Sequence, residues 1–197
     1  MMNKELYFAT PIYVADVGTP EVNAELEKNI INWANLDKGL VRTNMKGWHS
    51  TDDMHVKPEY KKLVDILFQA QAHIYKDENL DSEPFLGNMW ANINPPGGYN
   101  MPHIHPNSLW SGVYYVKTSK DCGHLKLEDP RSVSLMSRPK HVEGQLPARL
   151  WREAHFEPVA GRLIMFPSWV NHGVEPNMSN EIRISVSFNF LQRNFVV

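Results

Sequence analysis

Two histidines near the middle of the chain have a spacing that suits metal binding. His103 and His105 are separated by one residue, and side chains two apart on an extended backbone point to the same side. The two imidazoles could therefore bind one metal ion together. A third imidazole, that of His172, would complete a three-point face and leave other coordination positions open. Open positions distinguish a catalytic metal site from a structural one.

Turn residues surround each of these histidines. The segment before the pair, residues 94–102, contains three prolines and two glycines, which shape turns between strands. His172 follows an apolar run and a proline turn within residues 161–173. Each histidine alone is at least as consistent with a solvated loop or a hydrogen-bonded turn. The other histidines lack such partners in the sequence and are predicted to be structural or exposed: His49, His55, His73, His124, His141 and His155.

The most regular strand pattern of the chain begins at Arg183. Polar residues at 183, 185, 187 and 189 alternate with apolar residues at 184, 186, 188 and 190, so the apolar side should pack on a core. On the other side, Arg183 and Ser185 could bind a carboxylate. The guanidinium offers a planar fork of donors and the hydroxyl adds one more. A surface strand with a solvated arginine is the alternative.

Composition limits the classes of protein to consider. The 197 residues suffice for one domain with a full hydrophobic core. A net charge of -2 without basic runs argues against nucleic-acid or membrane partners. The single Cys122 excludes an intramolecular disulfide and suits a reducing compartment. Because neither a signal peptide nor a bilayer-spanning apolar stretch is recognisable, we expect a cytoplasmic protein.

Helical signals are confined to the first part of the chain. Thr19, Pro20 and Glu21 form a helix start, and apolar residues follow at helical spacing to Ala34. A second helix is predicted to open at Pro58 and to carry an apolar stripe as far as Ile74. Before these helices, residues 6–14 could form an edge strand.

From about residue 85 the pattern changes to short strands separated by turns. The predicted strands are Phe85–Asn94, Trp110–Val116, His124–Leu127, Gly161–Phe166 and Ile182–Leu191. Residues 132–155 form a long irregular insertion, of the kind that often serves as a lid or substrate-binding segment. We predict an α+β fold, with helices packed outside a β-sandwich or jelly roll.

The spacing of these residues resembles that of the Fe(II)- and 2-oxoglutarate-dependent oxygenases. Their signature is H-x-D/E, a His some tens of residues later, and an Arg or Lys about ten residues further on. Here His172 lies 69 residues after His103, and Arg183 lies 11 residues after His172. Three flanking segments resemble the prolyl-hydroxylase-like branch: Ser111–Val116, Gly123–Leu127 and Gly161–Phe166. The resemblance covers roughly residues 85–192 and implies a double-stranded β-helix there, with residues 1–84 as mainly helical support of the same single domain.

The chain departs from the family pattern at His105, which occupies the carboxylate position. If His105 binds the metal, three neutral imidazoles form the site. If it does not, water or a halide could take the position, as in related halogenases. Asp129 could instead supply a carboxylate, although it lies outside the usual position. We favour three histidines.

Cupins are the competing family on the same scaffold. Gly97, His103 and His105 fit the first cupin spacing, and residues 161, 167 and 172 fit the second. Leu109 and Trp110 stand where a cupin has its Glu. Cupins also require no arginine on the last strand. The final strand and Tyr115 therefore favour the oxygenases.

The resemblance implies a 2-oxoglutarate-dependent dioxygenase that hydroxylates a small-molecule or peptide substrate and releases succinate and CO2. Iron(II) would be held by His103, His105 and His172, and the distal carboxylate of 2-oxoglutarate by Arg183, Ser185 and Tyr115. Trp110 and Trp169, next to the metal motifs, could line the pocket. The basic residues of the 132–155 insertion mildly favour an anionic or peptide substrate. A cupin-type enzyme without 2-oxoglutarate, a silent metal-binding module and a homodimer stay open.

Overall fold

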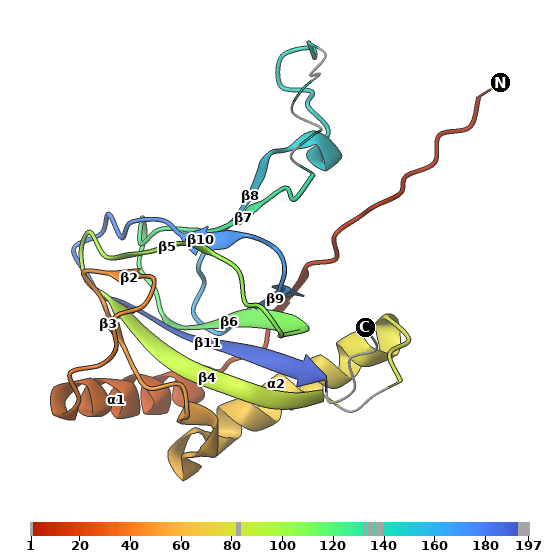
Figure 1. Ribbon diagram of the computed structural model, residues 1–197. Coiled ribbons are helices and arrows are strands. Elements are labelled where there is room, and N and C mark those ends of the chain that lie inside the picture. The colour runs from red at the N-terminus through yellow and green to blue at the C-terminus, as the bar shows by residue number, and fades with distance from the viewer. Residues whose placement is uncertain (1, 82–83, 132, 134–135, 137–139, 193–197) are drawn as a thin grey trace.

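Two antiparallel sheets packed face to face form the body of the molecule (Figure 1). The computed structural model describes residues 2–81, 84–131, 133, 136 and 140–192. The six-stranded sheet has β11 near its middle, between β6 and β4. In spatial order its strands are β1 (Tyr13–Asp16), β9 (Arg162–Pro167), β6 (Trp110–Lys117), β11 (Arg183–Gln192), β4 (Pro84–Asn94) and β3 (Trp48–His49).

The second sheet consists of five strands of two to five residues. In spatial order they are β2 (Asn44–Met45), β5 (Tyr99–His103), β10 (His172–Val174), β7 (Leu125–Glu128) and β8 (Glu153–Phe156). The central strand, β10, pairs with β5 on one side and with β7 on the other. The β5–β10 pair brings together segments that lie about seventy residues apart in the sequence.

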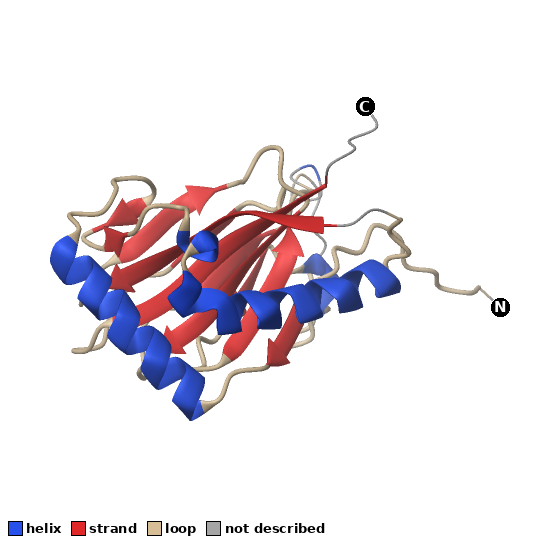
Figure 2. Cartoon of the chain, turned by 90° about the horizontal axis from the view of Figure 1, so that it is seen from below, coloured by secondary structure: helices blue, strands red, loops and turns tan. Residues whose placement is uncertain are grey.

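Two helices cover the outer face of the six-stranded sheet (Figure 2). Helix α1 (Pro20–Leu36) begins at Thr19, whose hydroxyl accepts a hydrogen bond from the Val22 amide at 3.4 Å. Helix α2 (Lys61–Asp77) follows the short 3-10 turns Met54–Val56 and Pro58–Tyr60. Within the described part of the chain, no helix has the length and apolar character needed to cross a membrane.

The six-stranded sheet separates two apolar cores. Its outer face and the helices enclose the larger core, which includes Ile184, Val186, Phe188 and Phe190 of β11. Gly112 lies opposite Phe188 in the β6–β11 pair, and a Cβ there would stand 2.3 Å from the Phe188 ring. The smaller core lies between the two sheets. Because the apolar residues of β11 face the helices, its alternating polar residues face this inner space.

The predicted fold class is confirmed: two helices lie outside a double-stranded β-helix. Two local predictions need correction. The edge strand predicted at 6–14 forms only from Tyr13, where pairing with β9 begins. The 132–155 insertion ends in β8, which pairs with β7, and contains the 3-10 turn Ala148–Leu150. Residues 132, 134–135 and 137–139 of that insertion lie outside the described residues.

Candidate metal and carboxylate site

The fold brings His103, His105 and His172 into one cluster. One ligand atom from each ring lies within 4.8 Å of the others. The ring centroids are 4.3 Å apart for His103 and His172, 4.8 Å for His103 and His105, and 5.0 Å for His105 and His172. Among the described residues, this is the one group of His, Cys, Asp or Glu side chains that meets the spacing of a metal site.

Strand pairing positions two of the three histidines. His103 ends β5 and lies directly opposite His172, which begins β10. His172 also lies opposite Leu127 of β7, so it is held on both sides. His105 lies beyond the end of β5, and its backbone N–H donates to the carbonyl of Ser168 at 3.1 Å. The turn before His172 therefore anchors the loop that carries His105.

Hydrogen bonds select the nitrogen that could bind a metal. The Nδ1 atoms of His103 and His172 lie 2.7 Å and 2.9 Å from the carbonyl oxygens of Met101 and Val170. Because a carbonyl only accepts, we assign the ring proton to Nδ1 in both, which leaves the Nε2 lone pairs free. The Trp90 ring packs against His105 with centroids 5.6 Å apart.

Burial keeps the cluster uncharged near neutral pH. Burial and, to a smaller extent, the nearby His103 ring lower the pKa of His172 to about 3 and that of His105 to about 4. Burial also lowers the pKa of His103. Since a metal binds the unprotonated imidazole, these rings need not lose a proton at pH 7 to coordinate one.

A polar cavity extends from the histidines between the two sheets. Its walls combine the histidine rings with apolar groups such as Phe166 and with polar groups from three neighbouring strands. Asn92 of β4, Tyr115 of β6 and Ser185 of β11 all lie on this inner face, and Ser185 pairs with both of the others. The polar side of β11 therefore faces the site.

Arg183 is buried at the end of this polar face, with 1% of its surface exposed. Its Nη1 donates to the carbonyls of Cys122, Gly123 at 3.2 Å and Glu175 at 3.4 Å. The backbone of Gly123 has φ +88°, and a Cβ there would lie 2.9 Å from Nη1. A glycine is thus required for this approach, and the alternative of a solvated surface arginine is wrong.

Two buried donors near this arginine have no partner. Neither Arg183 Nη2 nor the Tyr115 hydroxyl makes a hydrogen bond within the described structure. Burial raises the pKa of Tyr115, so the phenol stays protonated although the positive charge of Arg183 opposes the shift. Unpaired buried donors are costly, and an acidic ligand would satisfy both. The cluster of neutral imidazoles and these donors fits iron(II) together with a dicarboxylate.

Several residues proposed from the sequence lie elsewhere. Asp129 forms a bidentate pair with Arg131 and is outside the histidine cluster. Trp110 packs in the core beneath the helices, so its expected place in the pocket is wrong. Trp169 is 54% exposed and does not line the histidine cavity either.

Two of the histidines predicted to be structural or exposed share a carboxylate partner. The Nδ1 atoms of His124 and His155 each lie 3.0 Å from a carboxylate oxygen of Glu175. These imidazoles sit on the outer side of the five-stranded sheet rather than among the metal candidates.

A buried polar network behind the site was missed from the sequence. Ser111 Oγ is hydrogen-bonded to Asn189 Oδ1 at 2.6 Å and to Ser168 Oγ at 2.8 Å. Asn189 in turn donates to Asn88 Oδ1 at 2.7 Å. Ser168 is also the residue whose carbonyl holds His105. The only sequence signal for this network was the polar residue Asn189 in the alternating pattern of β11. That pattern does not predict that β6, which carries Ser111, pairs with β11.

Similar folds occur among solved 2-oxoglutarate-dependent enzymes. A Pseudomonas putida prolyl-4-hydroxylase matches with a TM-score of 0.66 and 18% identity over 94% of each chain. The epimerase SnoN from nogalamycin biosynthesis matches with a TM-score of 0.70 and 11% identity over 93% of this chain and 77% of that one. HygX from Streptomyces hygroscopicus, with nickel, 2-oxoglutarate and hygromycin B bound, matches with a TM-score of 0.68 and 10% identity over 95% and 85%.

At these identities the solved structures show a shared fold. No curated protein matches the sequence. A family described as "Putative 2OG-Fe(II) oxygenase" matches residues 88–189, a segment that includes the three histidines, Tyr115 and Arg183. Because this match spans just over half of the 197 residues, the chain belongs to the 2OG-Fe(II) oxygenase family.

Proposed function

We propose that this protein is an iron(II)- and 2-oxoglutarate-dependent dioxygenase that hydroxylates its substrate and releases succinate and CO2. The observation that carries the proposal is the combination of three neutral imidazoles, near the five-stranded sheet, with two unpartnered buried donors on the facing six-stranded sheet. The first set suits a divalent metal, and the second suits the distal carboxylate of the cosubstrate.

Each group then has a role that its environment supports. His103, His105 and His172 would hold the metal through nitrogen atoms that already face one another. Arg183 and Tyr115 would donate to the distal carboxylate, with Ser185 as a further donor on the same face. When bound, iron(II) and 2-oxoglutarate supply the activation of dioxygen. The protein supplies position, neutral ligands and a shielded cavity.

A second candidate is a cupin-type metal dioxygenase or isomerase that uses no 2-oxoglutarate. The observation in its favour is the third imidazole at the position where a carboxylate is expected. The buried, unpaired guanidinium nitrogen of Arg183 favours the first proposal, because a cosubstrate-free enzyme gives that group no partner.

Anaerobic titration of the iron(II)-loaded protein with 2-oxoglutarate tests the assignment. Chelation of iron by the keto acid gives a weak visible charge-transfer band. We expect saturable growth of this band in the wild type, followed by succinate formation when substrate and oxygen are supplied. Absence of the band at saturating 2-oxoglutarate would favour the cosubstrate-free alternative.

Substitution of Arg183 tests the carboxylate clamp. Because removing one partner of a buried charged contact costs about 2 kcal/mol or more, Arg183→Ala should weaken 2-oxoglutarate binding about 30-fold or more while metal affinity stays close to wild type. Tyr115→Phe should give a smaller loss and leaves the fold less disturbed. Arg162→Ala is the matched control, because that guanidinium pairs with Asp16 at the sheet edge. Equal 2-oxoglutarate affinities in all four proteins would overturn the clamp.

A further inference from the structure

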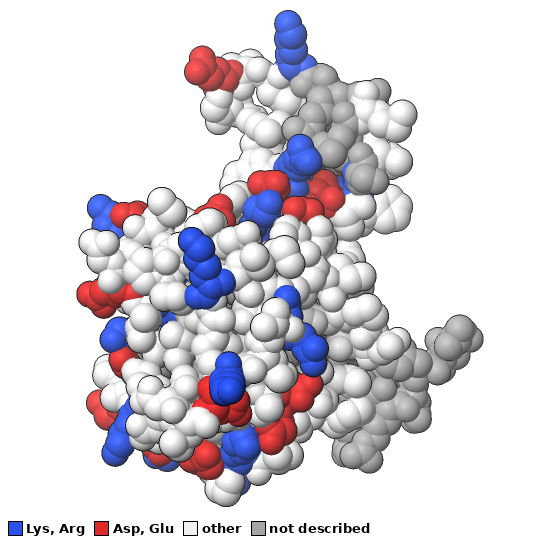
Figure 3. Space-filling model, turned by 60° about the vertical axis from the view of Figure 1, so that its left-hand side comes forward, with Lys and Arg blue, Asp and Glu red and all other residues white. Residues whose placement is uncertain are grey.

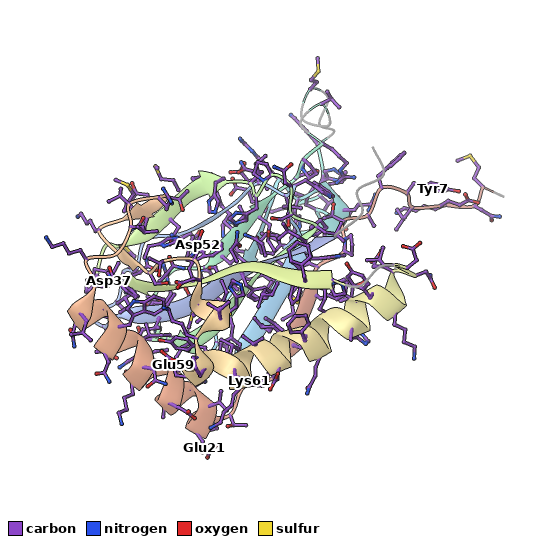
Figure 4. The ribbon with its side chains drawn as sticks, turned by 60° about the horizontal axis from the view of Figure 1, so that its bottom comes forward. Tyr7, Glu21, Asp37, Asp52, Glu59 and Lys61 are labelled. Atoms are coloured by element: carbon purple, nitrogen blue, oxygen red, sulfur yellow. The ribbon has the colours of Figure 1, made fainter. Side chains whose placement is uncertain are left out.

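A groove of about 410 Å³ lies outside the histidine cluster. One wall consists of residues 6–10 and 12 of the N-terminal arm (residues 2–12), which extends away from the sheets in Figure 1. Figure 4 shows Tyr7 on this arm, well away from the helices. The other wall is the base of the projecting insertion, residues 129–131 and 148–154.

The groove adjoins the proposed metal centre. Val170 and Leu127 line it; the Val170 carbonyl accepts from the His172 ring, and Leu127 lies opposite His172 in the β7–β10 pair. The cavity at the histidines is only about 40 Å³, which holds a few water molecules. A substrate must therefore be recognised largely outside that cavity, and this groove is the larger space beside it.

Hydrogen bonds between residues 129–131 and residues 149–152 hold the base of the insertion in place. The Asp129 amide donates to the Arg152 carbonyl at 2.8 Å, and Arg131 Nη2 donates to the Arg149 carbonyl at 2.8 Å. Arg131 is itself fixed by Asp129. The backbone that carries Arg149 and Arg152 is thus anchored to the end of β7.

Basic side chains at the groove outnumber acidic ones by one when Lys126, which pairs with both Glu128 and Glu153, is counted with the lining residues. Figure 3 shows basic and acidic side chains gathered where the insertion joins the sheets. Within the described residues, Arg149 and Arg152 form no ion pair, whereas every acidic residue that lines the groove does. Those acidic pairs are Asp129 with Arg131, and Glu128 and Glu153 with Lys126.

The arm and β8, which both contribute residues to the groove, each have main-chain groups without a backbone partner among the described residues. Among the described residues, the arm makes no backbone–backbone hydrogen bond before β1. Strand β8 ends the five-stranded sheet, so it has a paired neighbour only on the β7 side. Exposed strand edges accept an extended peptide as an added strand. Trp151, Tyr7 and Phe8 add exposed aromatic surface for apolar side chains.

We propose that this groove binds the substrate, as an extended acidic peptide segment lying between the arm and β8. The assignment of this peptide as substrate rests on the proposed oxygenase function, whereas the binding itself does not. Arg149 and Arg152 would pair with its acidic side chains and Trp151 would contact its apolar ones.

Fluorescence anisotropy with two labelled hexapeptides tests the binding. The probe alternates Glu and Leu, and its counterpart alternates Lys and Leu. We expect the acidic probe to bind and its basic counterpart to bind at least about tenfold more weakly. The double variant Arg149→Ser/Arg152→Ser should weaken the acidic probe about tenfold, since each exposed ion pair contributes modestly. Lys140→Ser is the matched control, an exposed basic residue of the same insertion that does not line the groove.

Equal binding of the two peptides, or an affinity that the double variant leaves unchanged, would overturn the proposal. If neither peptide binds while anilinonaphthalene sulfonate binds in an arginine-dependent manner, the occupant is a small anion and the peptide proposal is wrong. These measurements use protein without oxygen or turnover. Failure of the groove is therefore distinguishable from failure of the oxygenase assignment, which the 2-oxoglutarate titration tests.

Discussion

At the scale of single residues, His105 is the unusual feature of the site. A carboxylate at this position would offset one positive charge of a bound divalent metal, and a neutral imidazole does not. The ring nevertheless lies in the cluster, held by its backbone bond to Ser168 and by contact with Trp90. Its proposed role as a ligand is therefore open to a direct test.

Replacing His105 should change metal affinity. We expect His105→Ala to weaken nickel(II) binding at least about tenfold, because one of three ligands is lost. His105→Asp restores a ligand of the usual family type and should recover binding. Isothermal titration of the metal-free proteins measures both. An affinity unchanged in His105→Ala would show that this ring is not a ligand.

The buried polar network should act on the metal through His105. Ser111→Ala removes the hydroxyl that is bonded to both Ser168 and Asn189, and it should weaken nickel(II) binding about fivefold, corresponding to roughly 1 kcal/mol. If the effect passes through the Ser168 carbonyl to His105, Ser111→Ala should have no further effect in a His105→Ala background. A double-mutant cycle measures this coupling. The same loss in both backgrounds would mean that the network supports only the fold.

At the scale of elements, β11 joins stability and chemistry in one strand. Its apolar residues pack beneath the helices, whereas its polar residues line the cavity between the sheets. The two faces can therefore be altered separately.

The apolar face of β11 should dominate stability. Phe188 is fully buried in the core beneath the helices, so Phe188→Ala should lower the free energy of unfolding by about 3–5 kcal/mol. Phe8→Ala is the control, because that ring is 87% exposed on the N-terminal arm. Chemical denaturation of both variants measures the difference. If Phe188→Ala lowered the free energy of unfolding no more than Phe8→Ala does, the packing described for Phe188 would be wrong.

At the scale of the whole molecule, buried neutral histidines should make the metal-free protein sensitive to acid. Burial lowers the pKa of His49 below its usual 6.5. It lowers the pKa of His105 to about 4 and that of His172 to about 3. Below pH 6.5 the unfolded chain takes up protons that the folded chain does not, so unfolding becomes more favourable. Their contribution to stability is present above this pH and is lost as the pH falls toward the folded values.

Thermal unfolding of the metal-free protein should show this directly. We expect Tm to fall progressively between about pH 6.5 and about pH 4. His49→Gln should reduce the fall in Tm without removing it, because His103, His105 and His172 remain. A Tm that stays constant across this range would contradict neutral burial of these rings.

The sequence alone predicted the chemical groups and several elements. The alternation from Arg183 predicted β11, and the signals at Thr19 and Pro58 predicted where helical structure begins, because these patterns depend on near neighbours. The short strands β5 and β10 were not predicted, since their formation depends on pairing between distant segments.

Tertiary structure decided which of these groups meet. The alternation of β11 shows two unlike faces, but only the second sheet makes its polar face an interior one. Likewise, His103 and His172 become neighbours because β5 pairs with β10, and Arg183 is confined by carbonyls from two other loops. Local sequence determines residue types and periodicity. Long-range strand pairing determines burial, and burial leaves the imidazoles neutral and the two donors without partners.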